Sequence, residues 1–296
     1  MADAVISVSG LRKSYGPLEA VRGIDLDVRA GEVVAVLGPN GAGKTTTVEI
    51  LEGYRSRDAG EVSVLGVDPA QPTRGWRERI GIVLQECELQ QALTVEESIR
   101  LYAGYYPAPR PVAETIELVG LSEQTEQRAG RLSGGQRRRL DVGLALVGDP
   151  ELLFLDEPTT GFDPSARRQA WEMIASLREL GKTILLTTHY LEEAQALADR
   201  VAIIARGELV AVGPPKELAG RDAHAATVTF VLGAGAGEPP VSLGAVVENG
   251  RVRISTREPV RTLHALTGWA LERGIELEGL EVHRPSLEDA YLELTE

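Results

Sequence analysis

The chain has 296 residues, a length typical of two domains, with 43% hydrophobic and 25% charged residues. No apolar run approaches the roughly 18 residues that a membrane-spanning helix needs, so we expect no such helix. The opening residues lack the basic and long apolar regions of a signal peptide, so we expect no signal peptide. The single cysteine, Cys87, excludes an intrachain disulfide and favours a reducing cytoplasm, while the net charge of -13 argues against a protein that coats nucleic acid.

Short Val/Ile/Leu runs alternate with helical patterns up to about residue 221. The runs that we interpret as buried strands cover residues 33–37, 80–84, 152–155, 183–187 and 201–205. Continuous apolar strands joined by helices predict an α/β domain with a largely parallel sheet. Residues from about 90 to 150 carry helical pattern and few strand signals, so we expect a helical insertion there.

The texture changes in residues 222–296, where we expect a second, small α+β domain. A strand over 227–232 is followed by the glycine-rich segment 233–240 and by a hairpin over 246–254. Asn249 and Gly250 supply the positive φ angles of a type I′ turn. A helix over 259–273, a strand over 275–282 and a final helix from Leu287 complete the domain, with Ser286 and Asp289 predicted as a capping box.

Residues 38–45 fit the phosphate-binding pattern G-x-x-x-x-G-K-[ST], between a predicted strand and a predicted helix. Its members are Gly38, Pro39, Asn40, Gly41, Ala42, Gly43, Lys44 and Thr45, and Thr46 follows in the same helix start. Glycines let successive N–H groups point at phosphate oxygens. The lysine is then expected to reach the β- and γ-phosphates, and the hydroxyl of Thr45 to bind Mg²⁺.

Two carboxylates, Asp156 and Glu157, end the predicted strand that begins at Leu152. Ligands of open parallel sheets bind at the carboxyl ends of the strands. Asp156 therefore suits a magnesium ligand, and Glu157 suits a group that orients or deprotonates an attacking water. A solvated strand end is the alternative for the pair taken alone.

A second anion-binding helix start is predicted at residues 132–136, Leu-Ser-Gly-Gly-Gln. Ser133 is a suitable N-cap, and the glycines leave the first amides bare for an anion. We interpret the three arginines that follow, at 137–139, as a solvated basic face.

Together these motifs resemble the ATP-binding cassette (ABC) transporter ATPases over residues 1 to about 220, in that family's own order and spacing. The residues that carry the resemblance are Tyr15, 38–45, Gln85, 132–136, 155–158, 161–164 and His189. The end of the chain, at 285–291, is similar to the C-terminal domain of the drug-exporter ATPases of the daunorubicin-resistance type. Phe162 departs from the leucine of many relatives, and both residues are apolar.

The resemblance implies a P-loop NTPase fold with a helical insertion, and a role for each matching residue. Tyr15 would stack on adenine, Gln85 would touch Mg²⁺ and sense the transport partner, and His189 would contact the γ-phosphate. Ser133, Gly135 and Gln136 would close over the ATP of a partner subunit, and Asp163 would lie at the interface between two ATPase units.

The leading hypothesis is thus an ATPase subunit that homodimerises and couples Mg-ATP hydrolysis to a separate integral membrane permease. Multidrug or other export is the expected direction, at the cytoplasmic face of the cell membrane, with no nucleic acid bound. One alternative is a soluble ABC-type ATPase acting in translation or DNA repair, although such proteins typically carry two cassettes. Another is a P-loop kinase or GTPase, which would explain neither residues 132–136 nor His189. The transported substrate and the function of the C-terminal domain stay open.

Overall fold

The computed structural model describes residues 4–84, 89–219, 226–233, 237, 239–248, 250–283 and 286–295. Residue contacts divide the chain into two compact units. The first is Met1–Pro215 with Thr295, and the second is Lys216–Leu294 with Glu296. The boundary expected at residues 221 and 222 lies outside the described residues.

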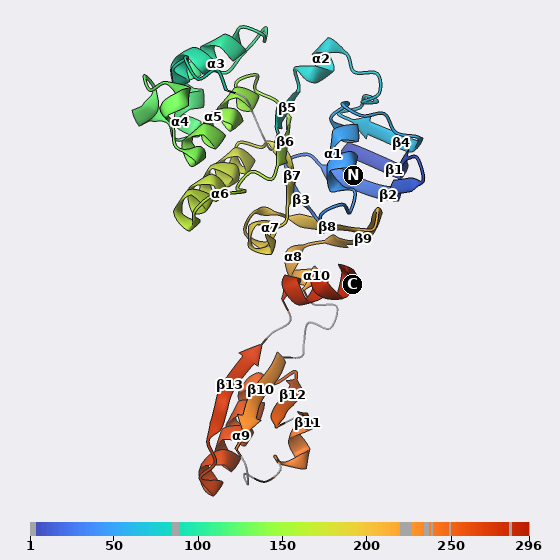
Figure 1. Ribbon diagram of the computed structural model, residues 1–296, viewed down its shortest axis with the longest axis vertical. Helices are drawn as coiled ribbons and strands as arrows, with labels where there is room; N and C mark the ends of the chain where they lie inside the picture. Colours follow the sequence, from blue (N-terminus) through green and yellow to red (C-terminus); the bar gives the residue numbers. More distant parts are fainter. Residues whose placement is uncertain are drawn as a thin grey trace. The chain divides into compact units, whose positions relative to one another are not determined.

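The first unit is built on a six-stranded sheet with the strand order β5-β6-β7-β3-β8-β9 (Figure 1). Its strands are β3 (Val33–Leu37), β5 (Ile80–Val83), β6 (Leu152–Asp156), β7 (Thr183–Thr188), β8 (Arg200–Ala205) and β9 (Glu208–Gly213). All neighbours pair in parallel except β9, which is antiparallel to β8. The first five are the strands predicted from the apolar runs, because a parallel strand covered on both faces is apolar throughout.

A second sheet of the first unit was not predicted. It has the order β2-β1-β4, all antiparallel, and consists of β1 (Ala4–Tyr15), β2 (Leu18–Arg29) and β4 (Ala59–Val64). One core joins it to the larger sheet: Ile6 and Leu11 of β1 belong to the same buried cluster as Trp76 and Phe154. Figure 1 shows α1 (Lys44–Leu51) beside this small sheet.

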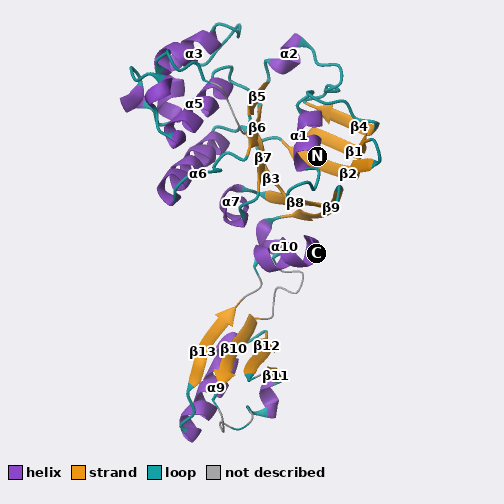
Figure 2. Cartoon of the chain, in the orientation of Figure 1, coloured by secondary structure: helices purple, strands orange, loops and turns teal. Residues whose placement is uncertain are grey.

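The helices of the first unit include a group inserted between β5 and β6, as expected (Figure 2). This group contains α3 (Val95–Ala103), α4 (Val112–Leu118), η1 (Ser122–Gln124), η2 (Ala129–Arg131) and α5 (Gly134–Leu146). The other helices are α2 (Arg74–Arg77), α6 (Pro164–Glu179), α7 (Leu191–Leu197) and α8 (Pro215–Leu218), which begins at the unit boundary. Within the described residues, no helix combines the length and the apolar character needed to cross a bilayer.

The second unit is the predicted α+β domain, an antiparallel sheet of order β11-β12-β10-β13. Its elements are β10 (Ala226–Leu232), η3 (Val241–Leu243), β11 (Val246–Glu248), β12 (Arg251–Thr256), α9 (Pro259–Arg273), β13 (Leu277–His283) and α10 (Leu287–Thr295). Phe230 and Ile254 of the sheet pack in one core with Trp269 of α9. The capping box of Ser286 and Asp289 is present. In the predicted hairpin turn, Gly250 has a φ of +80°, and Asn249 lies outside the described residues.

Candidate nucleotide site

The phosphate-binding pattern forms a tight loop between β3 and α1. Gly43 has a φ of +104°, and a Cβ atom there would lie 2.4 Å from the carbonyl oxygen of Ala20. At Gly38 a Cβ atom would lie 2.2 Å from the carbonyl oxygen of Ile204. Only glycine fits both places, so the ends of the loop are fixed by β2 and β8 rather than by the loop itself.

Lys44 is the first residue of α1 and is 6% exposed. Its Nζ donates hydrogen bonds to the carbonyl oxygens of Gly38 (2.8 Å) and Pro39 (3.1 Å). Burial lowers the pKa of Lys44, while the carboxylates of Glu157 and Asp156 oppose this shift. The loop lysine and the two carboxylates are therefore close enough to interact electrostatically.

Asp156 is the last residue of β6, and Glu157 follows it. The hydroxyl of Thr187 in β7 contacts both residues. This hydroxyl donates to Oδ1 of Asp156 and accepts the backbone N–H of Glu157 at 3.0 Å. The carbonyl oxygen of Thr187 accepts the same N–H at 3.1 Å. Glu157 itself has a φ of +45°, a left-handed conformation that a residue with a side chain adopts only where its surroundings impose it. The turn after β6 is thus clamped to β7.

The carboxylate of Glu157 has a neighbour at each oxygen. Nδ1 of His189 lies 3.3 Å from Oε1, and the hydroxyl of Thr160 donates to Oε2 at 3.0 Å. His189 directly follows β7, so strand pairing brings it next to the end of β6. The structure therefore brings together Lys44, Asp156, Glu157 and His189, all predicted as site residues.

The residues predicted to serve a partner's nucleotide lie elsewhere. Ser133 caps α5, and Gln136 completes a capping box with it. Asp163 caps α6 by accepting two backbone N–H groups at 2.9 Å. Within the described part of the chain, no hydrogen bond or ion pair joins Ser133, Gly135 or Gln136 to Lys44. Figure 1 shows α1 and α5 on opposite sides of strands β5 to β7.

Tyr15, predicted at the adenine, ends β1 and is 39% exposed. The Nζ of Lys13 lies 5.7 Å from its ring centroid, and the guanidinium carbon of Arg55 lies 5.5 Å from it. The ring is thus an accessible aromatic surface with cations beside it. Gln85, predicted at the magnesium, lies outside the described residues.

Arg138 corrects the interpretation of residues 137–139 as a solvated face. It is 8% exposed, and its guanidinium donates to the carbonyl oxygens of Leu84, Asp156 and Pro158. Arg137 is exposed and Arg139 is half-buried. One residue of α5 thus ties this helix to the ends of β5 and β6, and no motif in the sequence predicts that contact.

The described oxygen ligands fit a magnesium ion that is shared with a nucleotide. Thr45 is an exposed residue in the first turn of α1, and Asp156 is half-buried and accepts a side-chain hydrogen bond on Oδ1. Among the described residues, no three His, Cys, Asp or Glu side chains form a metal-binding group. Mg²⁺ commonly binds through one or two protein oxygens together with phosphates and water, so this sparse set is suitable.

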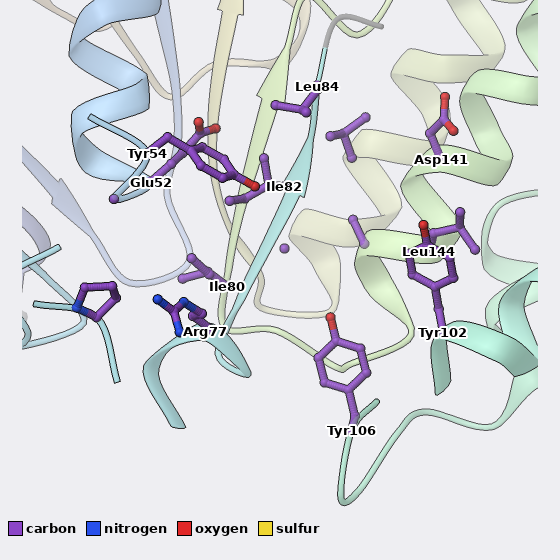
Figure 3. A pocket seen from close by; sticks show the side chains of 15 residues that line it. Glu52, Tyr54, Arg77, Ile80, Ile82, Leu84, Tyr102, Tyr106, Asp141 and Leu144 are labelled. Carbon is purple, nitrogen blue, oxygen red and sulfur yellow. The ribbon is translucent and has the colours of Figure 1, made fainter. Parts of the chain in front are cut away.

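A cavity of about 380 Å³ lies beside the site, between β5 and the inserted helices. Figure 3 shows Glu52, Tyr54, Ile82, Tyr102, Tyr106 and Asp141 among its lining residues. Burial, with smaller contributions from Asp156 and Glu49, raises the pKa of Glu52 to about 8. This carboxyl, at the end of α1, is a titratable group that the sequence did not indicate.

Comparison with known proteins identifies related families for both parts of the chain. A family model for the ABC transporter matches residues 21–160. A model for the C-terminal domain of ABC transporter domain-containing protein-like proteins matches residues 226–286.

Among solved structures, cbiO1 from Clostridium perfringens, part of the ABC transporter complex cbiONQ, is similar with a TM-score of 0.67. Its sequence is 28% identical, over 74% of this chain and 92% of that chain. The ADP conformation of an ATP-binding cassette of an ABC transporter has a TM-score of 0.65 and 25% identity, over 73% of this chain and 93% of that one.

Among the curated relatives, the daunorubicin resistance ATP-binding protein DrrA3 of Streptomyces coeruleorubidus is 38% identical, over 100% of this chain and 97% of its own length. The Nod factor export ATP-binding protein I of Rhizobium sp. (strain N33) is 38% identical, with coverage of 100% and 98%. The linearmycin resistance ATP-binding protein LnrL of Bacillus subtilis (strain 168) is 34% identical, with coverage of 98% for both chains. The chain belongs to the family of ATP-binding subunits of ABC transporters.

Proposed function

We propose that the chain binds and hydrolyses Mg-ATP, and that two copies of it drive transport through a separate integral membrane permease. One observation carries the hydrolytic part. The carboxylate of Glu157 is held between His189 and Thr160, on the same sheet edge as the phosphate-loop lysine. A fixed carboxylate next to a phosphate site can orient and deprotonate a water for attack on the γ-phosphate.

The loop and Lys44 hold the phosphates in this proposal. The residues that bind the nucleotide in the same chain are Tyr15, Gly38, Pro39, Asn40, Gly41, Ala42, Gly43, Lys44, Thr45 and Thr46. The bare N–H groups at the start of α1 favour an anion. The exposed ring of Tyr15 offers a stacking surface for adenine.

Thr45 and Asp156 hold Mg²⁺, with Gln85 as the third protein ligand. When bound, the ion neutralises charge that develops on the phosphate oxygens. Glu157 acts as the base, and His189 contacts the γ-phosphate. Lys44 then attracts the same phosphates as a compact point charge.

Two copies are needed because the second anion-binding helix start serves another subunit's nucleotide. Ser133, Gly135 and Gln136 close over the partner's ATP, and Asp163 lies at the interface. The separation of α1 and α5 across strands β5 to β7 supports this assignment (Figure 1), because one chain's Ser133 makes no described contact with its own Lys44.

Export is the transport direction that we propose, at the cytoplasmic face of the cell membrane through the permease. The support comes from relatives that match along nearly their whole length and whose names refer to daunorubicin resistance, Nod factor export and linearmycin resistance. The exported compound is proposed to be a drug or a similar small molecule.

The hydrolytic function is tested by phosphate release from Mg-ATP with the purified full-length chain. Lys44→Ala removes the charge aimed at the phosphates, so both ATP affinity and hydrolysis should fall sharply. Glu157→Gln keeps shape but removes the base, so turnover should fall while ATP binding survives. Normal hydrolysis by both variants would refute the assignment. Competition by GTP against ATP would test nucleotide choice, and co-purification with an integral membrane protein would test the transport part.

A further inference from the structure

Glu193 is a fully buried carboxylate in α7, with 0% exposure. Its Oε1 accepts a hydrogen bond from the hydroxyl of Thr159 at 2.7 Å and another from Nε1 of Trp171 at 3.1 Å. Oε2 has no hydrogen-bond partner among the described residues. Burying a carboxylate is unfavourable compared with burying an apolar side chain of the same size. Core packing alone therefore does not explain a glutamate here.

The first donor, Thr159, belongs to the turn that carries the proposed base. Thr159 is also fully buried, and the next residue, Thr160, donates to Oε2 of Glu157 at 3.0 Å. Thr160 directly follows Thr159 in the chain. The hydrogen bond between Thr159 and Glu193 therefore limits the positions that the hydroxyl of Thr160 can take. The left-handed backbone of Glu157 makes this support more important, since that conformation persists only where neighbours hold it.

The second donor, Trp171, links the Glu193 carboxylate to α6, and α6 in turn contacts the segment that carries His189. One turn earlier in α6, the guanidinium of Arg167 lies 4.3 Å from the ring centroid of Tyr190. The ring of Tyr190 in turn lies 4.1 Å, between centroids, from the ring of His189. Glu193 is therefore the place where α6, the helix after His189 and the turn after Glu157 are joined.

We propose that Glu193 is a positioning residue for ATP hydrolysis. By accepting the hydrogen bond of Thr159, it fixes the turn at 157–160 and so keeps the Glu157 carboxylate next to His189. This inference rests on the proposed ATPase function. Among the described residues, the hydrogen bonds of the Glu193 carboxylate go to Thr159 and Trp171 and not to the proposed site residues, so its effect passes through the turn at 157–160. Its loss should slow the chemical step and leave nucleotide binding to the phosphate loop unchanged.

The test compares three variants of the full-length chain in Mg-ATP hydrolysis. Glu193→Ala removes both accepted hydrogen bonds, and kcat should fall about tenfold to a hundredfold with KM within about twofold of the parent value. Glu193→Gln keeps an oxygen for both donors and should recover most of kcat. Glu192→Ala, at the exposed neighbouring position in the same helical turn, is the matched control and should behave like the parent.

A double-mutant comparison separates positioning from general damage. In the Glu157→Gln chain the base is already absent, so adding Glu193→Ala should lower the residual turnover by less than about threefold. Damage that does not act through Glu157 would lower it by the same factor as in the parent. Where Glu193→Ala does not fold, Thr159→Val removes the same hydrogen bond with nearly the same shape, and Thr159→Ser restores the hydroxyl. Valine should then lower kcat and serine should not.

The outcomes distinguish this inference from the function on which it rests. If the parent chain does not hydrolyse Mg-ATP, the proposed function is wrong, and if Glu157→Gln is fully active, the proposed role of Glu157 as the base is wrong. If the parent and Glu157→Gln behave as proposed, the positioning inference alone fails in any of three cases. These are a full kcat in Glu193→Ala or Thr159→Val, no recovery in Glu193→Gln, and equal factors in the double-mutant comparison.

Discussion

Nδ1 of His189 lies 3.3 Å from Oε1 of Glu157, although the two residues are 32 positions apart in the sequence. They are close in space because β6 and β7 are paired, with Asp156 opposite Thr187. The two residues leave adjacent parallel strands, β6 and β7, at the same edge of the sheet. This contact gives the carboxylate a cationic neighbour whenever the imidazole is protonated.

We predict that His189→Ala lowers kcat for Mg-ATP by about tenfold to a hundredfold, because Glu157 and, in the proposed function, the γ-phosphate each lose a polar neighbour. ATP binding, measured by equilibrium titration, should change little, since Lys44 and the loop are intact. His264→Ala, at an exposed histidine of α9, is the control and should leave turnover unchanged. A fully active His189→Ala chain would exclude His189 from the reaction.

Arg138→Met should destabilise the first unit and impair hydrolysis together. The guanidinium donates to the carbonyl oxygens of Leu84, which follows β5, of Asp156 at the end of β6, and of Pro158. Methionine leaves these oxygens without this donor. We expect a loss of about 2–4 kcal/mol in the free energy of unfolding, measured with urea. Arg137→Met changes the exposed neighbour and should lie within about 0.5 kcal/mol of the parent. Equal stability of the two variants would show that the hydrogen bonds of Arg138 to the three carbonyl oxygens do not stabilise the first unit.

Glu52→Gln should stabilise the chain in a pH-dependent way. Burial raises the pKa of Glu52 from its ordinary value of 4.5 to about 8. The stability contributed by its bound proton is fully present below pH 4.5 and is lost as the pH rises through 8. Glutamine has no such proton, so its advantage over the parent should grow across this window to roughly 3–5 kcal/mol near pH 8. Urea unfolding at several pH values measures this, and a difference that stays constant would refute it.

Mixed dimers test whether the nucleotide site is shared. Lys44→Ala damages a phosphate loop, and Ser133→Arg blocks a helix start. If the two serve opposite subunits, a mixed dimer has one site with both lesions and one with neither. We expect single-turnover hydrolysis by doubly tagged mixed dimers, assembled with the permease if required, to exceed that of either mutant homodimer. No gain in verified mixed dimers would mean that both residues serve one chain's nucleotide, or that Ser133 has no function there.

The five parallel strands of the six-stranded sheet were predictable because buried parallel strands are uniformly apolar, whereas the antiparallel edge strand β9 was not predicted. The three-stranded antiparallel sheet of the first unit, β2-β1-β4, was not predicted. In β2, for example, buried Ile24, Leu26 and Val28 alternate with charged residues, and β1 pairs with β2 through several register shifts. Alternation interrupted by irregular pairing gives a weaker signal than a continuous apolar run.

Motifs indicated residues of the site but not the contacts that support them. Thr187, Thr159 and Glu193 contact the site residues or the turn after Glu157 because segments far apart in the sequence pack together. No sequence motif with a fixed spacing predicts such contacts. Arg138 was misinterpreted because three consecutive helical residues point in directions about 100° apart, so a packed helix does not expose all of them. Membership of the ABC family also removes the P-loop kinase and GTPase alternatives.

The position of β3 between β7 and β8 has a consequence for biosynthesis. The strand before the phosphate loop is made early, yet both of its sheet neighbours are made late. During translation, the five consecutive apolar residues of β3 therefore lack both of their sheet neighbours until β7 and β8 leave the ribosome. A nascent chain that is released before β8 has a phosphate-binding motif in its sequence but no completed sheet to shape it.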